Sequence, residues 1–140
     1  MRRTLNEIRR VQRQRRSPRD ERGQALVEFA LVLPILMIIL LGTLQFGIAF
    51  FQWQQLSAAV SEGARIGIVS ASEANPAATV RTAAEQAAPG LADGITINVD
   101  GAFTPGQDIT VTGTFPVSIN VLGMVVYEGD LQSTRTMRVV

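Results

Sequence analysis

The hydrophobic pattern of the chain is dominated by one long apolar run near its beginning. Residues 29–51 carry no charge and read FALVLPILMIILLGTLQFGIAFF. As a helix this run would span about 34 Å, which is enough to cross a hydrocarbon core of roughly 30 Å. A helix that is apolar on every side is hard to cover in so small a chain, so a buried core helix is the weaker alternative. The run therefore predicts a membrane anchor from Phe29 to about Ile48.

The helical spacing continues beyond the apolar run. Apolar and small residues recur at steps of four and three, and they form a stripe made of Phe46, Phe50, Trp53, Ser57, Val60, Ala64 and Gly67. Four polar residues, Gln52, Gln55, Glu62 and Arg65, lie away from this stripe. The pattern predicts one continuous helix from about residue 24 to about residue 70, with an amphipathic outer half. Glu62 and Arg65 are spaced as a surface ion pair on this helix.

Shorter elements follow, and their period changes from helical to extended. Residues 76–88 predict a second helix, with Asn75 as its N-cap and Pro89-Gly90 at its end. Apolar and polar residues then alternate in 95–99 and 109–117, which predicts an antiparallel hairpin with a long loop. A third strand is expected at 131–139.

The segment INVLGMVV, Ile119 to Val126, has no clear period. It is compatible with a short helix or with an apolar loop. It could touch the sheet or the membrane surface, and its pattern leaves both possibilities open.

Together these elements predict an α+β protein of the pilin-like kind. A long N-terminal transmembrane helix continues into a small outer domain with one short helix and about three antiparallel strands. We expect the sheet to pack on the outer half of the long helix. The expected divisions are a basic segment at 1–23, the transmembrane part of the helix at 24–51, its outer part at 52–70, and the α+β domain at 71–140.

Charge adds an orientation to this picture. Residues 1–22 hold nine arginines against three acidic residues, a net charge of +6, whereas residues 23–140 have a net charge of −5. Because positive charge collects on the cytoplasmic side of membrane segments, we expect the N-terminus in the cytoplasm and the C-terminus outside. Trp53, with Phe50 and Phe51, lies where an aromatic anchor of the outer interface belongs. Nucleic-acid binding by the arginines has no support beyond charge, so no nucleic-acid partner is expected.

Composition excludes much of enzyme chemistry. The chain has no Cys, no His and no Lys, which removes thiol and Schiff-base chemistry, the usual general base and the common zinc ligands. Carboxylates at Asp93, Asp100, Asp108, Glu128 and Asp130 leave acid–base work or calcium binding conceivable, although the simpler interpretation of most of them is turn chemistry beside Gly. We expect no enzyme, no metal and no cofactor.

The junction before the apolar run carries the most specific pattern. Gly23 follows the arginine-rich segment, and Glu28 comes just before Phe29 at the start of the run. An acidic side chain inside a bilayer costs about 2.5–3.5 kcal/mol on insertion scales, so it usually has a partner. Taken alone, Glu28 fits equally well in the headgroup zone, near a helix N-terminus.

The sequence RGQALVEFALVLP resembles a type IV prepilin processing site. The resemblance implies that a peptidase cuts after Gly23 at the cytoplasmic face, that Gln24 becomes the new N-terminus, and that Glu28 and Phe29 are the fifth and sixth mature residues. In an assembled filament, Glu28 of one subunit would pair with the α-amine of another, so that each charge offsets the desolvation of the other.

Three features together resemble the TadE-like proteins, the minor pilins or pseudopilins of tight-adherence (Flp-type) pilus loci. They are the processing site with LVLPILM, the long helix, and the segment SEGAR at Ser61–Arg65. The resemblance is good from Arg22 to about Ile68 and only general beyond it. The leader is longer than in many type IV prepilins, and Phe29 stands where the Flp major subunit commonly has Tyr.

The resemblance implies a precursor in the cytoplasmic (inner) membrane that is processed by prepilin peptidase and takes part in assembly of an adhesion pilus. Its implied partners are the peptidase, other pilin subunits, the Tad-type assembly machinery and membrane lipid, and its destination after assembly is the cell-surface pilus. The alternative is a permanently anchored single-pass protein whose outer domain binds a ligand or a partner.

Overall fold

The computed structural model describes residues 18–140 of the chain and the side chains of residues 22–140. Most of the predicted leader, residues 1–17, lies outside the described residues. The elements are α2 (Pro18–Val69), α3 (Pro76–Ala87), a short 3-10 turn η1 (Pro89–Leu91), β1 (Thr96–Gly101), β2 (Asp108–Val121) and β3 (Met124–Arg138). The α+β architecture with one long apolar helix, one further helix and a three-stranded antiparallel sheet is therefore confirmed.

Helix α2 runs without interruption for 52 residues. Its beginning extends slightly upstream of the expected residue 24, and its end at Val69 agrees with the prediction. The chain divides into two compact units within this helix, residues 1–40 and residues 41–140. In the first unit, the described side chains of α2 from residue 22 onward are exposed.

Helix α3 begins at the residue that the sequence indicated. Asn75 is its N-cap, and the Asn75 side chain accepts a hydrogen bond from the backbone N–H of Ala78 over 3.2 Å. Pro76 occupies the first turn, where its missing N–H costs nothing. The helix ends before Pro89, which opens η1.

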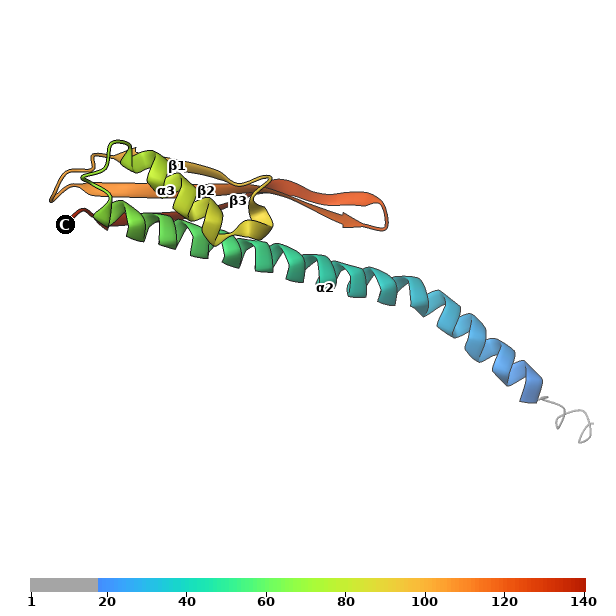
Figure 1. Cartoon of the computed structure of the whole chain (residues 1–140). Coiled ribbons are helices and arrows are strands. Elements are labelled where there is room, and N and C mark those ends of the chain that lie inside the picture. Colours follow the sequence, from blue (N-terminus) through green and yellow to red (C-terminus); the bar gives the residue numbers. More distant parts are fainter. Residues whose placement is uncertain (1–17) are drawn as a thin grey trace, which may run out of the picture. The chain divides into compact units, whose positions relative to one another are not determined.

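The sheet has the strand order β1-β2-β3, and both pairings are antiparallel. The hairpin of 95–99 with 109–117 is confirmed, with Ile97 opposite Gly113. The third strand is longer than expected, because β3 begins at Met124 rather than near Leu131. Beyond the end of β1 the sheet continues as a two-stranded hairpin of β2 and β3 (Figure 1).

The undecided segment 119–126 is the end of this hairpin. It is neither a helix nor an irregular loop: Val121 pairs with Met124, and Leu122 and Gly123 form the turn. Both turn residues have positive φ, 52° for Leu122 and 82° for Gly123. Positive φ at both central residues is the geometry of a two-residue hairpin turn whose twist matches that of the strands.

The core of unit 41–140 lies where α2, α3 and the sheet meet. Its members are apolar residues from all three and from the turn after α3: Leu56, Ala59, Val60, Ala64, Val80, Ala84, Ala88, Leu91, Ile97 and Val111. The contacts require small residues. A Cβ at Gly113 would lie 2.6 Å from Val60 Cγ2, and one at Gly63 would lie 3.0 Å from Ala84 Cβ. The sheet does pack on the outer half of α2, as expected.

The predicted stripe on α2 is only partly the buried face of the helix. Val60, Ala64 and Gly67 are buried as expected, but Phe46 and Trp53 are 68% and 42% exposed. Phe50 is also exposed, and its ring stacks on Trp53 with centroids 6.1 Å apart.

The buried face begins instead at Leu56, and two glutamines expected to point away lie at its edge. Gln52 is half-buried, and its Oε1 atom is buried without a hydrogen-bond partner. Gln55 is half-buried next to Gly90, where an added Cβ would meet Gln55 Oε1 at 2.8 Å. Small residues, not aromatic ones, therefore form the contact face, because they allow the helix and the sheet to approach closely.

Candidate processing and assembly site

The four residues that the sequence singled out lie on the first turns of α2. Gly23, Gln24, Glu28 and Phe29 are all exposed, and Phe29 is 60% exposed. Gly23 lies within the helix, and apart from its chain neighbours and the backbone of that helix, no described atom comes within 4 Å of the position that a Cβ would occupy there. Nothing in the described residues covers this side of Gly23, so it is open to a partner.

Gln24 and Glu28 are brought together by helical spacing. The Gln24 Nε2 amide donates a hydrogen bond to Glu28 Oε1 over 3.0 Å, one turn further along the helix. No described residue is recorded as a partner of the other carboxylate oxygen, Oε2. The carboxylate is thus oriented towards the start of the helix at Gln24, and it retains acceptor capacity for a second donor.

Immediately after this polar pair the helix becomes apolar. Within the described residues, α2 is the one helix long and apolar enough to cross a membrane, with no part of its most apolar stretch buried. Side chains such as Leu26, Leu31 and Ile35 are between 60% and 71% exposed. An apolar helix surface of this length requires lipid or other apolar helices around it.

The SEGAR segment lies on the same helix, in unit 41–140, and combines a packing face with a polar face. Gly63 and Ala64 are buried against α3, where Gly63 faces Ala84 and Val80. On the exposed side, Arg65 Nη2 lies 2.6 Å from Glu62 Oε1, so the predicted ion pair is present. The hydrogen bond from Arg65 holds the pKa of the Glu62 carboxyl below its usual value. The segment therefore fixes the position of α3 on α2.

The other described carboxylates lie outside helix α2, apart from the one at Glu62. Among the described residues there is no group of three or more acidic side chains that could hold a metal ion. Asp108 pairs with Arg138, whose Nε atom donates to Asp108 Oδ1 over 2.9 Å. Arg138 thereby lowers the pKa of the Asp108 carboxyl.

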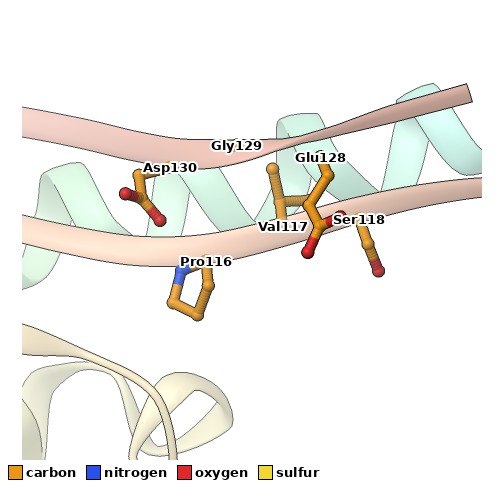
Figure 2. Close-up of a pocket in the computed structure, with 6 residues that line it drawn as sticks. All are labelled: Pro116, Val117, Ser118, Glu128, Gly129 and Asp130. Carbon is orange, nitrogen blue, oxygen red and sulfur yellow. The ribbon is translucent and has the colours of Figure 1, made fainter. Parts of the chain in front are cut away.

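Glu128 and Asp130 are two acidic residues that lie close together on β3. They line an open hollow on the β2–β3 hairpin together with Pro116, Val117, Ser118 and Gly129 (Figure 2). Both carboxylates are exposed, and they stand two residues apart on one strand. A pair of exposed carboxylates without a third ligand gives this hollow no recognisable chemistry.

Sequence reasoning left segment 119–126 open between contact with the sheet and contact with the membrane surface, and it did not predict the exposed apolar hairpin end that this segment forms. Leu122, Met124, Val125, Val126 and Tyr127 are each between 51% and 66% exposed. Residues 119–127 carry no charge in the sequence, but their order of apolar and polar residues did not show that they form the end of a hairpin.

Comparison with known proteins gave one match. Residues 23–65 match the family model described as TadE-like protein, and no curated protein and no solved structure matches the chain. The matched segment begins at Gly23 and ends at Arg65, the last residue of SEGAR. Over this segment the chain is similar to the TadE-like family of Tad pilus systems. Within the described residues, the one long apolar helix is of the kind that anchors a single-pass membrane protein.

Proposed function

We propose that this TadE-like chain is a minor pilin or pseudopilin precursor. Prepilin peptidase cuts it after Gly23, and the mature subunit takes part in assembly of an adhesion pilus. One observation carries the proposal: the family match begins at Gly23, where the polar start of α2 meets its apolar run. The chain acts as a peptidase substrate and an assembly component, not as an enzyme.

Topology follows from charge in this proposal. The arginine-rich residues 1–22 stay in the cytoplasm, and unit 41–140 carries its domain to the outside of the inner membrane. Gly23 and Gln24 then lie at the cytoplasmic face, where the peptidase acts. The mature chain keeps the whole apolar run and the outer domain.

The local structure supports access to the peptide bond between Gly23 and Gln24. This bond lies within helix α2, so a peptidase has to unwind the helix there before cleavage. Gly destabilises a helix interior by about 0.5–1 kcal/mol relative to Ala, which eases this unwinding. The absence of a side chain at Gly23 also leaves the bond unobstructed.

Glu28 has an assembly role in the proposal. Cleavage creates a positively charged α-amine at Gln24, and the Glu28 carboxylate already faces that end of the helix through its bond to the Gln24 side chain. When the apolar helices of several subunits pack together, Glu28 of one subunit pairs with the amine of a neighbour. An unpaired carboxylate would be costly among apolar helices, so the pairing fixes the relative position of subunits.

Co-expression with a prepilin peptidase tests the processing step. The full-length chain is expected to lose its leader, and Gly23→Val is expected to prevent this, because the branched side chain obstructs the bond. Gly42→Val is the matched control, because Gly42 lies in the same helix and also has no atom within 4 Å of a Cβ. Cleavage of Gly23→Val at the wild-type rate would contradict the proposed site. A wild-type chain that keeps its leader in the presence of the peptidase would favour a permanently anchored protein with a binding domain.

A further inference from the structure

The β2–β3 hairpin ends in a surface that the proposed function does not use. Five residues at this end, Leu122, Met124, Val125, Val126 and Tyr127, have exposed fractions of 60%, 66%, 60%, 66% and 51%. We call these residues the hairpin tip. Single exposed apolar side chains are common on protein surfaces, but a contiguous group of this kind marks a surface that meets an apolar partner.

The tip is apolar on both faces of the hairpin. Met124 and Val125 are consecutive in β3 and pair with Val121 and Asn120, so their side chains point to opposite faces. A hairpin that rests on one protein surface needs apolar residues on one face only. Exposed apolar residues on both faces are suited to an environment that is apolar all around them.

Contacts within unit 41–140 fix the direction in which the hairpin runs. Gly67 faces Ile109, and Gly113 faces Val60 and Leu56, so β2 advances as the α2 numbering decreases. Further along, residues 115–119 of β2 share a hollow with Gln45, Ile48, Ala49 and Gln52 of α2. The hairpin thus runs along α2 towards the apolar run.

The tip lies beyond this hollow. Leu122 follows Ile119 by three residues, which is at most about 10 Å in a strand. The turn therefore lies just past this hollow, on the side of the outer part of the apolar run.

Charged residues are absent from the end of the hairpin and appear only behind it. From Ile119 to Tyr127 the hairpin carries no charged residue, and the first charges behind the tip are Glu128 and Asp130. Tyr127 stands between the apolar end and these carboxylates, and Trp53 of α2 is exposed. Aromatic side chains with one polar atom are typical of membrane–water interfaces.

We propose that the hairpin tip inserts into the interfacial layer of the membrane that α2 crosses, on the side of the outer domain. The occupant of this surface is lipid. Insertion is shallow, because the two-stranded hairpin has unpaired backbone groups along its edges that require water or headgroups as partners. The tip then gives the outer domain a second membrane contact beside the helix. This inference rests on the membrane-spanning role of α2 in the proposed function.

Fluorescence quenching by lipid tests the insertion. The chain has no Cys, so Val125→Cys gives a unique site for an environment-sensitive NBD label on an exposed side chain. The labelled full-length protein is reconstituted at low density into phosphatidylcholine vesicles, with or without phosphatidylcholine that carries a spin label on its acyl chain. Leu36→Cys reports on the apolar run, and Ala74→Cys reports on an exposed loop after α2.

We expect spin-labelled lipid to quench the label at 125 to an extent comparable with the label at 36, and to leave the label at 74 unquenched. Quenching at 36 without quenching at 125 would overturn the insertion and leave the anchor intact. A blue-shifted but unquenched label at 125 would also overturn it, because that result means a protein neighbour such as a second copy. No quenching at 36 would overturn the membrane span, and the inference with it.

Discussion

Gly113 of β2 lies directly against Val60 of α2, so closely that a Cβ at residue 113 would be 2.6 Å from Val60 Cγ2 and 2.9 Å from Leu56 Cδ1. This contact holds the sheet on the outer half of the long helix. The family match covers α2 up to Arg65, whereas β2 lies outside the match. The contact therefore joins the matched helix to the unmatched sheet. The position of the sheet on α2 therefore depends on the absence of a side chain at one strand residue.

Gly113→Val is expected to destabilise the packing of the sheet on α2. Overpacking of a well-filled core typically costs about 1–3 kcal/mol, and the added side chain has to displace Val60 and Leu56. Hydrogen exchange of the β2 amides in the full-length protein in detergent measures the free energy of opening. Thr114→Val is the control, since Thr114 lies on the opposite face of the same strand and should change stability by less than about 0.5 kcal/mol. Equal protection of wild type and Gly113→Val would contradict the tight contact.

Removal of the α3 cap is expected to loosen the first turn of that helix. Asn75→Ala deletes the side-chain acceptor of the Ala78 N–H, and the loss of such a cap costs about 0.5–2 kcal/mol. The amides of Ala78 and Thr79 should then exchange faster with solvent. Ser72→Ala, an exposed change in the same loop, should leave these amides unaffected. Unchanged exchange in Asn75→Ala would mean that the cap contributes nothing.

The ion pair of Asp108 with Arg138 predicts a pH dependence. Arg138 lowers the pKa of Asp108 in the folded chain, so the pair stabilises the fold at a pH above the ordinary aspartate value of about 3.9. That contribution is lost as the pH falls through the lowered pKa. Carboxyl NMR should show the Asp108 pKa rising in Arg138→Gln, whereas Arg135→Gln on the same strand should leave it unchanged. The effect on stability should be small, since both side chains are exposed.

A change at Glu28 should separate processing from assembly. Glu28→Gln keeps the size of the side chain and removes its charge, so it should permit cleavage after Gly23 but reduce pilus assembly. Cleavage is read from the mass of the membrane protein, and assembly is read from pili sheared from cells. Glu85→Gln on α3, also an exposed position, is the control and should assemble normally. Normal piliation with Glu28→Gln would remove the pairing from the account.

The sequence predicted those elements whose signals are local. Asn75 with Pro76 marks a helix start through cap chemistry, and the alternation in 109–117 marks a strand with one buried face. Both signals depend on residues that are near one another in the chain. The position of Glu28 relative to Gln24 was likewise predictable, because helical spacing alone brings residues four apart together.

The remaining features depend on partners that are distant in the chain. Helical spacing placed Phe46, Phe50 and Trp53 on the same stripe of α2 as Gly67, but these aromatic residues are exposed. Close approach occurs further along the helix, where Gly67 faces Ile109 of the sheet and Gly63 faces α3. Next to a membrane segment, aromatic residues find an apolar environment without protein contacts. The hairpin end was missed for another reason, since Leu122-Gly123 lacks the Asn or Asp that usually announces such a turn.

The central claim is that the chain is a precursor cut between Gly23 and Gln24. N-terminal sequencing of the protein purified from the membranes of cells with a functional prepilin peptidase tests it most directly. We expect a mature chain that begins at Gln24 and reads QALVEFALVLP. A chain from the same cells that still begins at Met1 would contradict it.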